Sequence, residues 1–140
     1  MIRFLLDTDT VSLQERGDPA VLAHLRAVAA DELAVSIVTV EEALRGRLAM
    51  LARHQRGEAR AHAYHKLWET LQFFAAAHVL LFDAECEQQC AALRTEGVRV
   101  GTRDLRIAAT ALVHNLTLVT RNHRDFARVP GLRIEDWSVS

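Results

Sequence analysis

Hydrophobic positions along the chain fall into two alternating patterns. Short apolar runs bounded by polar or turn residues are typical of buried β-strands. They occur at residues 2–6, 33–38, 79–82, 116–119 and 132–134. Longer segments repeat apolar residues every three to four positions, which is the period of an amphipathic helix. These segments are about residues 18–30, 39–56, 58–77, 83–96 and 102–115. Strands separated by helices predict an α/β fold, with a mostly parallel sheet of four to five strands covered by helices on both faces.

Capping residues mark where the predicted helices begin. Asp18 and Pro19 suit the N-cap and the first helical position of one helix. Asp83 suits the N-cap of a later helix, and Thr39 is expected to cap the helix that follows the second strand. Gly57 is expected to separate that helix from the next one.

Length and composition favour a single packed domain over residues 1–140. Half of the 140 residues are hydrophobic, which is enough for one core and argues against disorder. The apolar start reaches Asp7 at once, so it is too short for a signal peptide. No stretch of about 18 apolar residues occurs, so we expect no membrane span and a cytoplasmic protein.

Charge gives a weaker indication of the binding partner. The formal net charge is −1, which is no global signal for nucleic acid. Of 17 lysine and arginine residues only Lys66 is a lysine, and guanidinium groups suit bidentate contacts with phosphate. A genome rich in G and C would also favour arginine codons, so the arginine excess is compatible with either explanation.

The two cysteines are expected to pack in the core. Cys86 and Cys90 lie four residues apart in a predicted helix and therefore on one face of it. The chain has no Cys-x-x-Cys pair, so we do not expect a structural zinc site.

Acidic and polar residues gather where the predicted strands and helices meet one edge of the sheet. They are Asp7 and Asp9 after the first strand, Glu41, Glu42 and Asp104 in first helical turns, and Thr120, Asn122 and Asp125 after the fourth strand. Sites in parallel sheets form beyond the carboxyl ends of the strands. Carboxylates brought together there repel one another unless a cation lies between them. Oxygen ligands without sulfur favour Mg²⁺ or Mn²⁺.

Each of these residues also has a purely structural explanation. An Asp after a strand commonly begins a turn. An acid in the first turn of a helix is stabilised by the helix dipole without any function. From spacing alone, both explanations stay open.

Five motifs, in order along the chain, resemble those of the PIN-domain VapC toxins. They are LLDTD at residues 5–9, VTVEEALRG at 38–46, GTRDLRIAA at 101–109, LVTRNHRDF at 118–126 and VPGLRIEDW at 129–137. The resemblance covers residues 2–137. It implies a three-layer α/β/α fold and an endoribonuclease that depends on Mg²⁺ or Mn²⁺. It also implies a homodimer and a cognate antitoxin.

The same motifs imply roles for individual residues. The catalytic and metal-binding acids are Asp7, Glu42 and Asp104, and Glu42 is preferred to Glu41 because it lies four residues before Gly46. Many members of the family carry an Asp near the position of Asn122. Either Asn122 or Asp125 completes the site here, or the three carboxylates suffice. The expected substrate-binding residues are Thr120, Arg103 and Arg121.

Further residues near these motifs suggest surfaces. Five arginines lie close in sequence to the proposed acids and are expected to form a basic rim that attracts RNA; they are Arg45, Arg47, Arg103, Arg121 and Arg124. Apolar residues of the helix pair at 39–77 are candidates for contact with a dimer mate or an antitoxin helix, with core packing as the alternative. They include Leu67, Trp68, Leu71, Phe73 and Phe74.

Two other functions remain open at this point. One is a PIN-domain nuclease of RNA processing that has no antitoxin. The other is a non-catalytic interaction module that keeps the fold, which Asn122 in place of an acid leaves possible. A short neighbouring gene with a DNA-binding start would favour the toxin.

Overall fold

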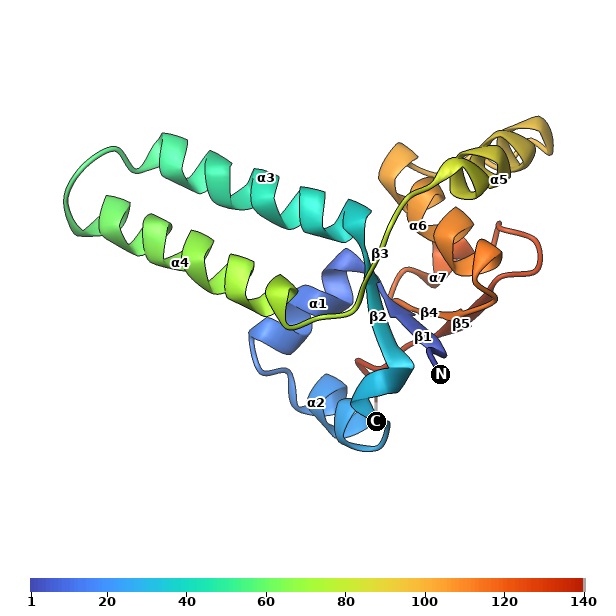
Figure 1. Cartoon of the computed structure of the whole chain (residues 1–140), viewed down its shortest axis with the longest axis horizontal. Coiled ribbons are helices and arrows are strands. Elements are labelled where there is room, and N and C mark those ends of the chain that lie inside the picture. Colours follow the sequence, from blue (N-terminus) through green and yellow to red (C-terminus); the bar gives the residue numbers. More distant parts are fainter. Residues whose placement is uncertain (140) are drawn as a thin grey trace.

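Five parallel strands form the centre of the structure, a computed structural model that describes residues 1–139 (Figure 1). The strands are β1 (Phe4–Leu6), β2 (Leu33–Ser36), β3 (Val79–Leu80), β4 (Thr117–Val119) and β5 (Arg133–Glu135). Their order across the sheet is β3-β2-β1-β4-β5, and every neighbouring pair is parallel. The predicted parallel sheet is therefore confirmed, with β1 at its centre.

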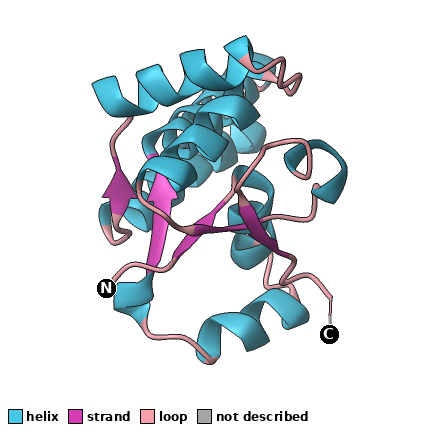
Figure 2. Cartoon of the chain, turned by 90° about the vertical axis from the view of Figure 1, so that its right-hand side faces the viewer, coloured by secondary structure: helices cyan, strands magenta, loops and turns pink. Residues whose placement is uncertain are grey.

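Helices cover both faces of this sheet (Figure 2). They are α1 (Thr8–Glu15), α2 (Pro19–Arg26), α3 (Ile37–Arg53), α4 (Gly57–Ala75), α5 (Ala84–Thr95), α6 (Thr102–Val113) and α7 (His123–Phe126), with a 3₁₀ turn at Ala30–Glu32. Successive side chains of a strand point to opposite faces. Leu5 therefore packs with α5 and α6, while Phe4 and Leu6 pack with α1 and α2. The result is the expected three-layer α/β/α arrangement.

Helices α3 and α4 form a hairpin that extends to one side of the sheet (Figure 1). Cys86 and Cys90 are free and buried on α5, as the helical spacing predicted. None of the helices within residues 1–139 is long and apolar enough to cross a membrane.

The start of α3 differs from the prediction. The Ser36 hydroxyl accepts a hydrogen bond from Val38 N at 3.0 Å, so Ser36 is the N-cap and the helix begins at Ile37. The cap predicted at Thr39 was wrong, and the second strand ends earlier than expected. A side-chain cap here outweighs the β-branched preference of the residues that follow it. Glu41 and Glu42 consequently lie beyond the first turn of α3, not within it.

Two short helices were missing from the prediction. Asp7 caps α1, because its Oδ1 accepts from Thr10 N at 2.8 Å, and Asn122 caps α7. Both helices are short and begin with residues of modest helix propensity. Their caps suited a turn equally well, so the sequence pattern alone gave no helical signal. The helix after Asp18 also ends sooner than predicted, at Arg26.

Candidate active site

Asp7 ends the central strand and lies almost completely inside the protein, with 5% of its surface exposed. Burial raises the pKa of the Asp7 carboxyl above its usual range, and hydrogen bonds from Thr120 and Thr10 offset this only in part. A carboxylate at such a position is costly in its ionised form unless a positive charge comes close. Asp7 is therefore a strong candidate for binding a cation.

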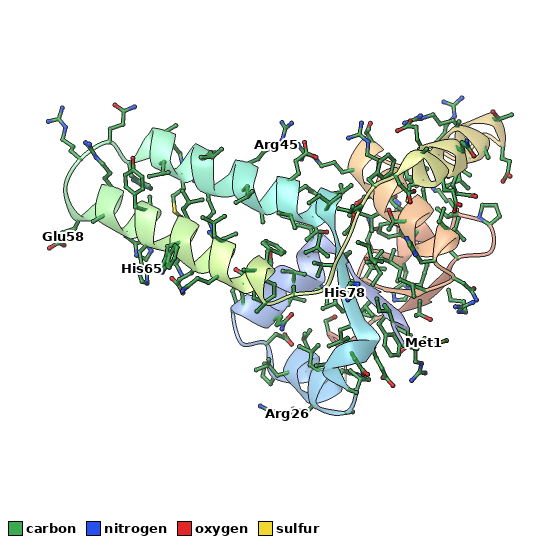
Figure 3. All side chains as sticks on the ribbon, in the orientation of Figure 1. Met1, Arg26, Arg45, Glu58, His65 and His78 are labelled. Atoms are coloured by element: carbon green, nitrogen blue, oxygen red, sulfur yellow. The ribbon has the colours of Figure 1, made fainter. Side chains whose placement is uncertain are left out.

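Glu42 faces Asp7's helix, whereas Glu41 faces away from it. The Thr8 hydroxyl donates a hydrogen bond to Glu42 Oε1 at 2.8 Å. Glu41 instead pairs with Arg45 at 2.9 Å, and Figure 3 shows Arg45 on the side of α3 that faces away from α4. The structure thus supports the choice of Glu42 that the motif implied.

Asp104 lies in the first turn of α6, as predicted, and is only partly exposed. Burial raises the pKa of Asp104, and the negative charges of Glu42, Asp7 and Asp125 raise it further. Asp104 therefore lies close enough to three acids from other segments of the chain for their charges to act on it. Whether this cluster of acids forms one metal site stays a prediction.

Asn122 and Asp125 have different positions relative to this cluster. Asn122 Oδ1 accepts from Asp125 N at 3.2 Å, and Asn122 Nδ2 donates to Asp125 Oδ2 at 3.0 Å. The carbonyl oxygen of Asn122 is thus engaged in capping α7. Asp125 is the residue whose charge acts on Asp104. Of the two candidates for the fourth position, only Asp125 brings a negative charge close to Asp104.

Asp9 is paired at the edge of the cluster. Arg121 Nε and Nη2 lie 2.6 and 3.0 Å from Asp9 Oδ2 and Oδ1, in a bidentate ion pair. This pair occupies both oxygens of Asp9 and fixes Arg121 near the acids. The proposed substrate-binding residue Arg121 is exposed, so phosphate can reach it.

The other proposed substrate-binding residues lie in contrasting places. Thr120 is fully buried, and its hydroxyl accepts from Asn122 N at 3.0 Å. Its side chain stabilises the loop and is not accessible to RNA. Arg103 is exposed on α6, with Nη1 3.8 Å from Glu42 Oε2.

A groove beside the acids carries two of the five arginines predicted for the basic rim, Arg45 and Arg103. It runs between α3 and the start of α6 and is lined by Glu41, Glu42, Arg45, Gly101, Thr102, Arg103, Asp104 and Arg106. Arg106 was not predicted, although it lies only two residues after Asp104 in the third motif. Arg47 does not belong to this rim, because it bonds Thr70 and Glu15 on the other side of α3. Sequence proximity placed it wrongly, since neighbouring residues on a helix point in different directions.

The cluster offers the chemistry of a divalent metal site. Within residues 1–139, no three His, Cys, Asp or Glu side chains are arranged so that they would hold a metal ion as they stand. The four acids nevertheless bring only oxygen ligands, which Mg²⁺ and Mn²⁺ prefer. The repulsion acting on Asp104 is the kind of conflict that a cation relieves. By charge and ligand type, the residues fit such an ion.

Comparisons with known proteins identify the family of the chain. A model of the PIN domain matches residues 4–132. The chain is 31% identical over 141 residues to the tRNA(fMet)-specific endonuclease VapC of Salmonella typhimurium, covering 98% of this chain and 99% of that protein. It is 30% identical to the Shigella flexneri protein of the same name, covering 99% of this chain and all (100%) of that one.

A solved structure gives the same result. The crystal structure of DNA-bound VapBC from Salmonella typhimurium matches with a TM-score of 0.76 and 29% identity, covering 98% of this chain and 99% of that chain. The Salmonella and Shigella relatives are both named VapC. The chain belongs to the PIN-domain family.

Proposed function

We propose that this protein is a metal-dependent endoribonuclease and the toxin of a toxin–antitoxin pair. The observation that carries the proposal is the position of the acids: Asp7 lies buried at the end of the central strand, the Thr8 beside it hydrogen-bonds Glu42, and Asp104 lies close enough to Asp7, Glu42 and Asp125 for their charges to raise its pKa. The VapC ribonucleases among its relatives support the same activity. As such an enzyme it would act in the cytoplasm, as a PIN domain over residues 1–140.

In the proposed mechanism, these acids would bind Mg²⁺ or Mn²⁺. When bound, the ion supplies an activated water and offsets negative charge that develops on the phosphate. Asp7, Glu42 and Asp104 would hold the ion, with Asp125 as the fourth acid. Arg103 and Arg121 are exposed at the edge of the cluster and would bind the phosphates that flank the cleaved bond.

RNA cleavage tests this proposal directly. We expect cleavage with Mg²⁺ or Mn²⁺ and none with excess chelator. Asp7→Asn, Glu42→Gln and Asp104→Asn should each abolish cleavage while the circular dichroism spectrum stays native. Glu41→Gln is the matched control, because its side chain pairs with Arg45 and not with the cluster. Full cleavage in chelator, or equal loss in Glu41→Gln and Glu42→Gln, would contradict the mechanism.

Mapping of the cleaved RNA defines the substrate. The named relatives are specific for tRNA(fMet), so initiator tRNA is the first RNA to test, followed by total RNA after brief expression. Cleavage of tRNA or another translation RNA supports a toxin. Processing of a precursor RNA without growth arrest would favour the alternative, a PIN-domain nuclease that has no antitoxin.

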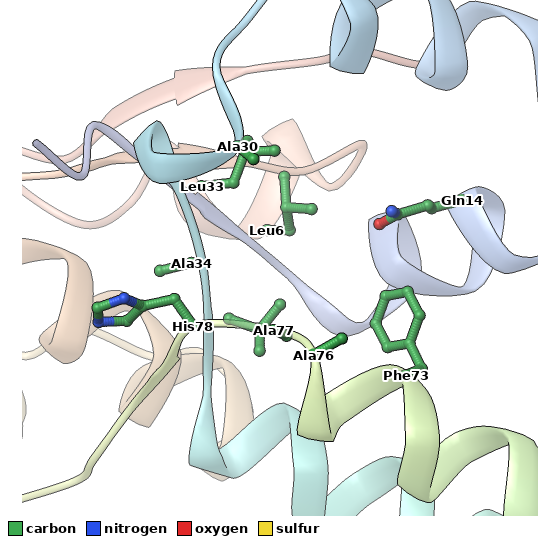
Figure 4. A pocket seen from close by; sticks show the side chains of 10 residues that line it. Leu6, Gln14, Ala30, Leu33, Ala34, Phe73, Ala76, Ala77 and His78 are labelled. Carbon is green, nitrogen blue, oxygen red and sulfur yellow. The ribbon is translucent and has the colours of Figure 1, made fainter.

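An apolar hollow on the sheet is the proposed binding site for the antitoxin (Figure 4). Its lining includes Leu6, Leu33 and Phe73, and its volume is about 290 Å³. Gln14 also lines it, and Gln14 Oε1 is the one buried side-chain oxygen or nitrogen within residues 1–139 that lacks a hydrogen-bond partner. A peptide bound in the hollow would supply both an apolar side chain and an N–H donor.

Pull-down with the product of the neighbouring gene tests this site. Ala30→Trp, at the edge of the hollow, should reduce capture at least tenfold and leave RNA cleavage unchanged. A surface control is Ala91→Trp on α5, an exposed position that does not line this hollow. Undiminished capture by Ala30→Trp would place the antitoxin elsewhere.

A further inference from the structure

We propose that Thr39 and Thr8 form a directed hydrogen-bond relay that fixes Glu42 and leaves Glu42 Oε2 to bind the cation. This inference rests on the proposed function, because it concerns the same metal site. In this role Thr8 and Thr39 are positioning residues, which act through Glu42 and do not touch the substrate.

The direction of the relay follows from counting protons. Thr8 Oγ1 donates to Glu42 Oε1 at 2.8 Å, and a carboxylate oxygen only accepts. Thr8 has a single hydroxyl proton, so its second contact, with Thr39 Oγ1 at 3.1 Å, must be one that it accepts. Thr39 therefore donates to Thr8, and Thr8 donates to Glu42.

Burial makes this arrangement rigid. Thr39 is fully buried, and within residues 1–139 Thr8 is the only partner that the structure gives its hydroxyl. A Thr side chain has one rotatable bond with few allowed positions. Glu42 has three such bonds and would otherwise sample many orientations. The relay thus selects one orientation of a flexible side chain.

The selected orientation separates the two oxygens of Glu42. Oε1 accepts the hydrogen bond from Thr8, while Oε2 forms a long ion pair, at 3.8 Å, with Arg103 Nη1 at the start of α6. Thr8 also directly follows Asp7, the N-cap of α1. The Thr8 hydroxyl therefore ties Glu42 of α3 to the residue beside Asp7, and leaves Oε2 on the side of α6, where a cation would take the place of the Arg103 guanidinium.

Calorimetric titration of the purified chain with Mn²⁺ tests the relay without relying on activity. We expect Thr8→Val to raise the Kd for Mn²⁺ by roughly 10–100-fold, the usual effect of losing a residue that orients a metal ligand. Thr8→Ser keeps the hydroxyl and should stay within about twofold of the wild type. Thr39→Val should cause a smaller loss than Thr8→Val. Thr8→Ala replaces Thr8→Val if valine prevents folding.

Thr110→Val is the matched control. Thr110 is also fully buried on a helix, but its hydroxyl bonds Arg106 O within α6 and contacts none of the acids. The Thr110→Val protein should bind Mn²⁺ with the Kd of the wild type, even if its melting temperature is lower. Comparison of Thr8→Val with Thr110→Val therefore distinguishes the loss of Glu42 positioning from a general loss of stability.

A double-mutant cycle decides whether Thr8 acts through Glu42. In a Glu42→Gln background, Thr8→Val should have no further effect on Mn²⁺ binding. Wild-type Kd in Thr8→Val, or an undiminished loss in the Glu42→Gln background, overturns the relay. If Asp7→Asn abolishes binding while Thr8→Val does not change it, only the relay fails. If Asp7→Asn binds Mn²⁺ as the wild type does, the proposed metal site fails and the relay fails with it.

Discussion

Arg121 and Asp9 hold each other in a bidentate ion pair, with N–O distances of 2.6 and 3.0 Å, although 112 positions separate them in the chain. The pair joins α1 to the loop after β4 at the edge of the acidic cluster. If Arg121 binds phosphate as proposed, Asp9 and the RNA phosphate compete for its guanidinium group.

Removal of the Asp9 charge should strengthen RNA binding. Asp9→Asn deletes a negative charge that RNA must approach and releases Arg121 toward phosphate. We expect RNA affinity to rise about two- to fivefold and the salt dependence to steepen by up to roughly one unit of log–log slope. Fluorescence anisotropy with an Asp104→Asn background, which prevents cleavage, measures both. Arg121→Gln should weaken binding, and weaker binding in Asp9→Asn would show that the pair itself forms the RNA site.

Asp7→Asn should stabilise the metal-free protein at neutral pH. Burial raises the folded-state pKa of Asp7, so the stability linked to this group is complete below its unfolded pKa of about 3.9 and falls as the pH rises through the raised folded value. Asn has no ionisable carboxyl, so the stability of the Asp7→Asn protein does not fall in this way as the pH rises. Its side chain can still cap α1. In chelator at pH 7, we expect the melting temperature of Asp7→Asn to lie about 3–4 °C above that of the wild type, which corresponds to roughly 1 kcal/mol.

Two comparisons identify the cause of that change. The advantage of Asp7→Asn should disappear below about pH 4, where the wild-type carboxyl is protonated. Asp7→Ala lacks the cap and should be about 1 kcal/mol less stable than Asp7→Asn. An Asp7→Asn protein that melts below the wild type at pH 7 would mean that the carboxylate stabilises the fold.

Asn122→Asp should make folding more dependent on metal. Asp caps α7 as well as Asn does, but it loses the hydrogen bond that Asn122 Nδ2 donates to Asp125 Oδ2 at 3.0 Å. Two carboxylates then face each other. We expect a lower melting temperature in chelator, recovery with Mg²⁺ and tighter binding of a second ion, measured by thermal shift and calorimetry. Unchanged melting in chelator would mean that the two side chains separate freely.

The outer surface of the α3–α4 hairpin should mediate homodimerisation. Trp68 is 57% exposed and Leu71 45%, and Tyr64 and Leu48 are also exposed. Phe74 is buried, so part of the surface expected from the sequence belongs to the core. Trp68→Glu should shift a dimer to monomer in analytical ultracentrifugation, with RNA cleavage per chain as a second readout. A monomeric wild type at high micromolar concentration would exclude this role.

The sequence located the strands well, because apolar runs next to turn residues have few alternatives inside a parallel sheet. Leu5 and Leu118 illustrate this, as both are fully buried partners in neighbouring strands. The site was harder to predict. Asp125 and Asn122 stayed alternatives because the residues after the fourth strand gave no helical pattern. The short helix α7 brings Asp125 back to the cluster, and four residues capped by Asn122 leave no periodicity to detect.

The sequence pattern could not predict which side chains form hydrogen bonds with one another. Thr39 was predicted to cap a helix, but Ser36 takes that position and Thr39 lies buried against Thr8. Spacing defines which residues share a helix face, whereas a hydrogen bond between Thr8 and Glu42 depends on how two helices cross. The motif nevertheless identified Glu42, because the resemblance carries tertiary information that periodicity does not contain.

The central position of β1 sets the order in which the acidic cluster can assemble during synthesis. β1 precedes the other strands in the chain, yet it pairs with β4, where Leu5 lies opposite Leu118. Asp7 is therefore synthesised well before Asp104 and Asp125. A nascent chain holds an unfinished set of acids until the residues up to Asp125 have been synthesised. As the proposed metal site needs acids from both parts of the chain, it would form only after β4 has joined β1.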